Sequence, residues 1–339
     1  PFLCNWIKTM NCTSRRQKMR AVFNGARCIQ PGSVYDPLSA RVAEDLGFEA
    51  GMFAGSVASL TVLGAPDLIV LTLSEFADQA LRICRAGELP LIVDADHGYG
   101  NALNVRRTVE ELETAGVACL TIEDTLLPKR FGQSATEFLE IDEGVGKMKA
   151  ALDARQDKEM IVLGRTSAVA ANGVDDGIRR ALAYLDTGVD GIMFVGVKTR
   201  AELDAIAAAI DAPIMLGGSG AELKDPAYLA EYGVRVSLQG HQPFMAAVQA
   251  MHDGLKALRD GTPPAQLQGV ASSELSLRTE YFSRRNQRLP LRFLATATRT
   301  YRSRISMFWF FTVTSAARTC CLKRCLPRIW IWPRCPRIS

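Results

Sequence analysis

The stretch Leu91-Ile92-Val93-Asp94-Ala95-Asp96-His97-Gly98-Tyr99-Gly100 is an apolar run that ends in two carboxylates and then turns through glycine. One amphipathic segment further along, Leu120-Thr121-Ile122-Glu123-Asp124 has the same character. Buried strands ordinarily end in turn residues, so strands that end in acids indicate that carboxylate oxygens are being presented to a ligand. The pattern predicts an α/β protein with an acidic site at the carboxyl end of its sheet.

The segments around these two strands alternate between short apolar runs and amphipathic stretches. The predicted strands are 28–34, 50–54, 89–94, 118–123, 160–165, 191–195, 213–216 and 234–238. The predicted helices are 37–46, 72–86, 102–115, 142–154, 175–187, 200–210, 225–232 and 243–259. Eight strand–helix units are typical of a (β/α)8 TIM barrel, and an open doubly wound sheet is the alternative. In both folds, ligands bind beyond the carboxyl ends of the strands.

Composition divides the chain into a body and an unusual tail. The chain holds 40 Lys and Arg and 36 Asp and Glu, but residues 283–339 contain 13 of the basic residues and no acid. We interpret 20–270 as the catalytic barrel domain, 271–282 as the start of a C-terminal helical segment and 1–19 as a non-native leader. The tail is either frameshifted or disordered sequence, or a basic arm for nucleic acid or a membrane surface. It carries no nucleic-acid motif, which favours the first interpretation, so we expect no nucleic-acid partner.

The cysteines and the apolar runs bear on where the protein works. Of the nine cysteines, four lie in the tail and the other five are scattered without CxxC or CxH spacing, which favours free thiols in a reducing compartment. The sequence shows no secretory signal and no apolar run of about 18 residues or more. These features predict a cytoplasmic protein without a membrane partner.

Asp94 and Asp96 are the strongest indication of a metal site. They lie two residues apart on an extended chain, so their side chains share a face. After the next strand, Glu123 is predicted to be a further acid near the same ion, and Asp124 to turn outward and hold the loop. Carboxylates without a cysteine or histidine cluster suit Mg²⁺, with Mn²⁺ as the alternative. Asp67 is a candidate either for this site or for a helix cap.

Arg165, His241 and Ser56 are candidates for binding an anionic substrate. Arg165 ends the fifth predicted strand, where a guanidinium suits either a carboxylate clamp or an ion pair with the strand-end acids. His241 follows the eighth strand, among the loops that form active sites in barrels, whereas His252 falls within a helix and is interpreted as structural. Ser56 follows the second strand and offers a hydroxyl beside backbone N–H groups.

Taken in order along the chain, these residues belong to motifs that resemble those of the isocitrate lyase/phosphoenolpyruvate mutase superfamily. The motifs are Phe53-Ala54-Gly55-Ser56-Val57, Gly64-Ala65-Pro66-Asp67, Asp94-Ala95-Asp96-His97-Gly98-Tyr99-Gly100-Asn101, Ile122-Glu123-Asp124 and Gly164-Arg165-Thr166. The resemblance extends from about residue 20 to residue 277. Within the superfamily, Ser56-Val57-Ala58-Ser59-Leu60 and Glu123-Asp124-Thr125-Leu126-Leu127-Pro128 are most similar to the bacterial oxaloacetate decarboxylases.

The resemblance implies a TIM barrel that catalyses Mg²⁺-dependent decarboxylation of oxaloacetate to pyruvate and CO₂ through a metal-bound enolate. It also implies a metal site in which Asp94 is the main protein ligand of the ion. Asp67, Asp96 and Glu123 would hold the water shell of that ion.

The resemblance further implies the substrate contacts and the assembly. Ser56, Arg165 and His241 would contact the 2-oxo acid. Arg165 would stabilise developing negative charge, and proton delivery to C3 is a second expectation for His241. Members of the superfamily form tetramers and often exchange a C-terminal helix, so the resemblance implies a homotetramer.

Several departures from the superfamily pattern narrow the expected reaction. The lyases carry a Lys-Cys-Gly-His motif on the loop after the fourth strand, but here Leu126-Leu127-Pro128-Lys129-Arg130-Phe131-Gly132-Gln133 contains no thiol and no mutase signature. Ser167 stands where relatives have asparagine, and the sequence beyond Ser276 does not follow the superfamily. The alternatives are a methylisocitrate lyase-like or phosphonopyruvate hydrolase-like enzyme for another 2-oxo acid or phosphonate, or a catalytically inactive barrel.

Overall fold

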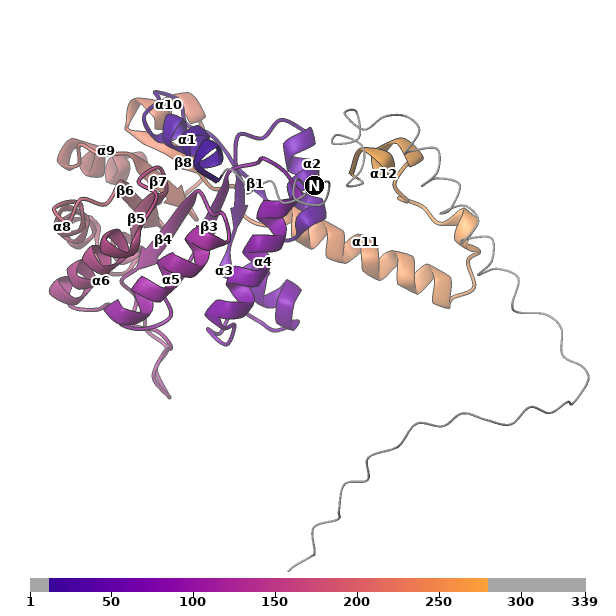
Figure 1. The fold of residues 1–339 in the computed structure, drawn as a ribbon, viewed down its shortest axis with the longest axis horizontal. Coiled ribbons are helices and arrows are strands. Elements are labelled where there is room, and N and C mark those ends of the chain that lie inside the picture. The colour runs from indigo at the N-terminus through magenta and orange to yellow at the C-terminus, as the bar shows by residue number, and fades with distance from the viewer. Residues whose placement is uncertain (1–11, 280–339) are drawn as a thin grey trace, which may run out of the picture. The chain divides into compact units, whose positions relative to one another are not determined.

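Eight parallel strands form one sheet in which each strand pairs with the next in chain order (Figure 1). The computed structural model describes residues 12–279, so the predicted tail 283–339 and the first part of the predicted leader lie outside the described residues. The strands are β1 Gly32–Ser33, β2 Gly51–Phe53, β3 Leu91–Asp94, β4 Cys119–Glu123, β5 Ile161–Thr166, β6 Gly191–Val195, β7 Ile214–Gly217 and β8 Val234–Ser237. A parallel bridge between Ile29 and Val236 joins the first strand region to the last. This arrangement confirms the predicted (β/α)8 barrel.

The predicted crossover helices are all present, with ends within a few residues of the expectation. They are α2 Pro37–Asp45, α4 Leu73–Ala86, α5 Ala102–Thr114, α6 Ile141–Ala154, α8 Val174–Leu185, α9 Arg200–Ala209, α10 Pro226–Glu231 and α11 Gln242–Arg259. Four of them begin with a capping box, in which the N-cap side chain and the side chain three residues later bond to each other's backbone N–H. These local signals explain why the helix starts are predictable from the sequence.

Six further elements connect or extend these units. They are α1 Cys12–Phe23, α3 Gly55–Ala58, the π-helix η1 Ser59–Leu63, α7 Ala168–Asn172, the 3-10 helix η2 Pro264–Gln266 and α12 Ser273–Thr279. Only α12 corresponds to a segment expected to be helical, because the others are short or lack an apolar period. The short α3 and α7 lie directly after strands, at the end of the barrel where the acids emerge.

The helix α1 was not expected, and it includes residues 12–19 of the predicted leader. Met19 is fully buried in the core, and Arg15 and Arg16 are 3% and 4% exposed. Their guanidinium groups donate to carbonyl oxygens that precede β3 and β4, including those of Gly87 and Val117. Residues 12–19 are therefore an integral part of the barrel, at the end opposite to the strand-end acids.

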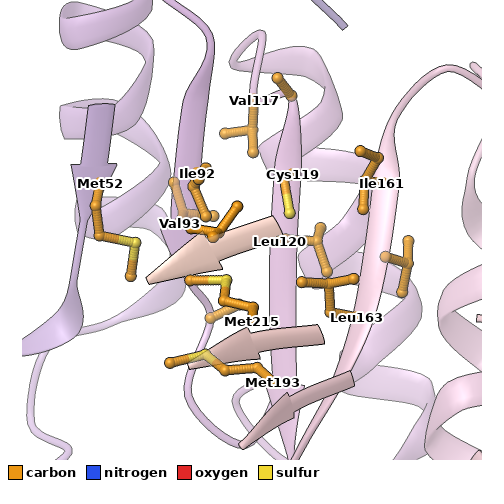
Figure 2. Close-up of a cluster of buried hydrophobic side chains, with 14 of the residues drawn as sticks. Met52, Ile92, Val93, Val117, Cys119, Leu120, Ile161, Leu163, Met193 and Met215 are labelled. Carbon is orange, nitrogen blue, oxygen red and sulfur yellow. The ribbon is translucent and has the colours of Figure 1, made fainter. Parts of the chain in front are cut away.

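Inside the barrel, the apolar side chains of successive strands form a packed core (Figure 2). Met52, Met193 and Met215 from three different strands gather there, and each is at most 3% exposed. Toward the carboxyl ends of the strands, polar residues follow this apolar layer. Asp94 is paired with Thr121, and Glu123 is paired with Arg165. Paired residues of neighbouring strands point to the same side of a sheet, so the polar side chains sit together directly above the apolar core.

The last crossover helix, α11, differs from the others because none of its 18 residues is buried. Large apolar side chains at intervals of three or four residues are exposed along it: Met245, Val248, Met251, Leu255 and Leu258. Helices packed on a core normally bury such a stripe. Across residues 12–279, none of the helices combines the length and apolarity needed to span a membrane.

Candidate active site

A cavity of about 680 Å³ opens beyond the carboxyl ends of the strands and is lined by every residue that the sequence nominated for the site. Those residues are Ser56, Asp67, Asp94, Asp96, Glu123, Arg165 and His241. They come from the ends of five different strands or the connections that follow them, yet the barrel brings them to one place. What each residue does there remains a proposal.

Arg165 links two of the acids across neighbouring strands. Its Nη1 donates to Asp94 Oδ1 and Oδ2 at 2.5 and 2.6 Å, and its Nη2 lies 3.3 Å from Glu123 Oε2. Burial acts to lower the pKa of Arg165, but the charges of Asp94, Glu123 and Asp96 raise it above its usual value. The arginine is therefore a permanent cation at the base of the cavity, and both predicted roles, the ion pair and the anion clamp, are open to it.

Asp96 is held in an unusual backbone conformation. Its φ angle of 47° lies in the left-handed region, which non-glycine residues seldom adopt. The Asp96 carbonyl accepts the Glu123 N–H at 2.8 Å, and its own N–H donates to Asp94 Oδ1 at 3.2 Å. Burial and the charges of Asp94 and Glu123 raise the pKa of Asp96 well above its usual value. This local strain, fixed by hydrogen bonds, aims a third carboxylate at the same cavity.

The remaining acids complete one cluster of negative charge. Glu123 is 5% exposed, and its Oε2 accepts the Thr125 hydroxyl at 2.9 Å. Burial raises the pKa of Glu123 even though Arg165 opposes the shift. Burial and the charge of Asp94 likewise raise the pKa of Asp67, which follows η1 on a loop. The cavity thus holds four carboxylates, and the pKa values of three of them, Asp67, Asp96 and Glu123, are raised.

Buried polar atoms and the donor types fit a hard divalent cation. Among residues 12–279, no three acid, histidine or cysteine side chains already surround one point as ligands. Mg²⁺, however, usually keeps several waters and takes only one or two carboxylates directly. Two buried donors, Arg165 Nε and the Tyr99 hydroxyl, have no hydrogen-bond partner in the described part of the chain. Carboxylate oxygens that repel one another therefore suit such an ion, and the two spare donors suit an anionic oxygen or a water molecule.

The three histidines occupy different environments, and one of them faces the cavity. His241 caps the start of α11, is half-buried, and its Nδ1 lies 2.9 Å from Ser33 Oγ. Burial lowers the pKa of His241 although Asp94 opposes the shift. His97 is buried away from the cavity, where burial and Lys147 lower its pKa to about 4. His252 is exposed on α11 and pairs with its neighbour along the helix.

Asp124 turns away from the cavity, as expected from the sequence. It is fully buried, and its Oδ2 accepts the Tyr184 hydroxyl at 2.7 Å and Arg180 Nη1 at 3.1 Å. Its backbone carbonyl also accepts the Leu139 N–H. The residue therefore fixes the return of the loop that follows β4 onto the helices behind it.

Two polar residues near the site were not predicted from the sequence. Ser33, at the end of β1, bonds His241, and the same strand-end rule that singled out the acids could have indicated it. Lys147 of α6 is 2% exposed, and its Nζ donates to the His97 carbonyl at 2.7 Å, which holds the loop after Asp96. A lysine inside the apolar stripe of a helix was the available signal.

The thiols lie elsewhere. The described residues contain four cysteines, Cys12, Cys28, Cys84 and Cys119, and none of them lines the cavity. The loop after β4 contributes Leu127, Pro128 and Lys129 instead. Burial raises the pKa of Cys84 to about 12. Residues 12–279 therefore place no thiol where it could act as an acid or base on a ligand in the cavity.

Comparison with known proteins gives the same picture. A profile described as phosphoenolpyruvate phosphomutase matches residues 24–259. A protein named oxaloacetate decarboxylase from Bradyrhizobium diazoefficiens is 61% identical over 265 residues, which cover 78% of this chain and 92% of that protein. The structure of an oxaloacetate acetylhydrolase with the inhibitor 3,3-difluorooxalacetate has a TM-score of 0.70 at 29% identity, covering 79% of this chain and 93% of that one. A phosphonopyruvate hydrolase complex with oxalate and Mg²⁺ has a TM-score of 0.69 at 28% identity, covering 78% and 94%.

Proposed function

The chain belongs to the phosphoenolpyruvate phosphomutase family, and we propose that it catalyses the decarboxylation of oxaloacetate to pyruvate and CO₂ with the help of Mg²⁺. The observation that carries this proposal is the 61% identity to a protein named oxaloacetate decarboxylase over 92% of that protein's length. The cavity supports it, because a decarboxylation needs an anion site and an electron sink but no thiol acid. A cleavage that depends on a loop cysteine is correspondingly disfavoured.

The acids of the cavity would hold the metal ion. Asp94 would be the direct ligand, since its carboxylate lies at the centre of the cluster and keeps lone pairs beyond those that Arg165 engages. Asp67, Asp96 and Glu123 would hold the water shell of the ion. When bound, Mg²⁺ or Mn²⁺ supplies a Lewis acid that polarises the 2-oxo group of the substrate.

The chain's own residues would bind and orient the substrate. Arg165 offers its spare Nε–H and its permanent charge to an anionic oxygen, and so stabilises negative charge that develops as CO₂ leaves. Ser56 adds a hydroxyl from the β2 side of the cavity, and His241 would contact the substrate from the β8 side. The apolar side chains of Met52 and Met193 line the cavity beneath them.

The test is pyruvate release by the purified full chain with oxaloacetate and Mg²⁺, compared with Mg²⁺ alone. The rate should exceed the metal-only rate, and Asp94→Asn should return it to that background. Asp142→Asn, an exposed acid in the first turn of α6, is the matched control and should keep the wild-type rate. A wild-type rate equal to the background would reject the decarboxylase. Turnover of methylisocitrate or phosphonopyruvate would then favour the other lyase or hydrolase, and no turnover an inactive barrel.

We also propose that the protein is a homo-oligomer, a tetramer by resemblance, in which the apolar stripe of α11 is covered by a second copy. The support is the exposure of that stripe on a helix without a single buried residue. Leu255→Glu, within the stripe, should lower the native mass measured by light scattering. Ala246→Glu, on the opposite face of the same helix, should leave the mass unchanged.

We further propose a cytoplasmic location. The four cysteines between residues 12 and 279 are all free thiols, including the half-buried Cys12 and Cys28. Exposed or half-exposed thiols persist in reducing compartments, whereas secreted proteins generally pair them. Cell fractionation followed by immunoblotting tests this location directly.

A further inference from the structure

We propose that Ser33 is a positioning residue that donates its hydroxyl proton to His241 Nδ1, and thereby keeps the ring neutral with its own proton on Nε2, facing the substrate. The inference rests on the proposed function for the identity of the anion that His241 meets. It concerns the tautomer of the histidine, which can be measured without any turnover.

The geometry joins two residues that are 208 positions apart in the chain. Ser33 ends β1, His241 caps α11 after β8, and Oγ lies 2.9 Å from Nδ1. Both side chains are half-buried. Two further contacts cross the same junction of the first and last strands: Gln239 Nε2 to Gln30 Oε1 at 2.9 Å, and the edge-to-face rings of Tyr35 and Phe244 at 5.0 Å. The serine and histidine are therefore held together from both sides.

The direction of the hydrogen bond follows from the partners open to the Ser33 hydroxyl and from the protonation of the His241 ring. The bond to His241 is the one hydrogen bond that the Ser33 side chain makes within residues 12–279, so Nδ1 is the acceptor within reach of its proton. Burial lowers the pKa of His241, so the ring is neutral at neutral pH and has one acceptor nitrogen. With that acceptor at Nδ1, the ring proton is on Nε2.

The surroundings favour the same tautomer. His241 lines the cavity, so Nε2 is the ring nitrogen left to meet a ligand there. The cavity already holds Asp94, Asp96 and Glu123, and the substrate brings further carboxylate oxygens. A lone pair on Nε2 would face these acceptors without a hydrogen, whereas an Nε2–H can donate to them. A neutral ring that donates in this way holds the substrate rather than protonating it, so the proton that reaches C3 would come from water.

The experiment is ¹⁵N solid-state NMR of the full chain with ¹⁵N-labelled histidine. The chain contains three histidines, and the resonances that vanish in His241→Gln identify those of His241. The wild type should show an unprotonated Nδ1 and a protonated Nε2. Ser33→Ala should move proton density to Nδ1, whereas Ser33→Thr, which keeps the hydroxyl, should preserve the wild-type tautomer.

The second measurement is the activity of the variants. Loss of one neutral hydrogen bond that orients the ring should lower kcat/KM for oxaloacetate about threefold to tenfold in Ser33→Ala, with recovery in Ser33→Thr. A protonated Nδ1 in the wild type, or an unchanged tautomer in a folded Ser33→Ala, overturns the proposal. If the wild type decarboxylates no faster than Mg²⁺ alone, the proposed function fails, but the spectra still decide the role of Ser33. If Ser33→Ala does not fold, the wild-type spectrum decides it alone.

Discussion

Replacing Gly55 by alanine tests whether a small displacement of the Asp96 carboxylate lowers activity. A Cβ on Gly55, the first residue of α3, would lie 3.0 Å from both carboxylate oxygens of Asp96. Ordinary contact begins at 3.4 Å, so the carboxylate must retreat by about 0.4 Å. The backbone of Asp96 cannot follow freely, because its carbonyl is bonded to the Glu123 N–H. Since a displacement of about 1 Å in an active site can cost about 100-fold, we expect kcat/KM to fall about fivefold to tenfold.

The same substitution should change stability little. Crowding costs about 1 kcal/mol, and the better helix propensity of alanine offsets most of it. Gly146→Ala is the matched control, because Gly146 also lies in a helix and its Cβ would meet no atom within 4 Å. The control should keep full activity and gain about 0.5–1 kcal/mol in the free energy of unfolding. Pyruvate release, corrected for the metal-only rate, and urea unfolding are the assays. A Gly55→Ala enzyme within twofold of wild type would refute the argument that Asp96 must be tightly placed.

Three further predictions concern the charged groups. Arg165→Lys loses the guanidinium that joins Asp94 through Nη1 to Glu123 through Nη2, so kcat/KM should fall about 10- to 100-fold, and a smaller loss in pyruvate release would contradict the clamp. Asp124→Ala removes the buried acceptor of both Arg180 and Tyr184, so urea unfolding should show a loss of about 3 kcal/mol, whereas an unchanged midpoint would mean that the pair is not structural. Because the pKa values of Asp96 and Glu123 are raised, these groups take up protons at a higher pH than ordinary carboxyl groups do. Protons therefore compete with Mg²⁺ as pH falls, and the rise in Tm on adding Mg²⁺ should be larger at pH 8 than at pH 5.5; an equal rise would argue against the acids as its site.

The fold and the acids were predictable because their signals are local. Asp94, Asp96 and Glu123 lie at or just beyond the ends of largely apolar runs, and the strand–helix count then places them at one end of a barrel. The partner of Ser33 lies 208 residues away, and no local sequence pattern predicts such a pair. The helix that carries Arg15 was missed for the same reason, since its arginines are buried by bonds to carbonyls of distant loops rather than by an apolar period.

The charges of the cavity explain why a dianionic substrate should need the metal ion. Four carboxylates line it, and Arg165 is the one cation among the described lining residues that is not exposed to solvent. His241 adds no charge at neutral pH, because burial lowers its pKa. The raised pKa values of Asp67, Asp96 and Glu123 show that the cluster already favours taking up positive charge, as protons or as a cation. Two further negative charges could enter only against strong repulsion unless a divalent cation is present. Substrate binding and metal binding should therefore be coupled through the same acids, with Arg165 and the neutral donors Ser56 and His241 selecting the orientation of the anion.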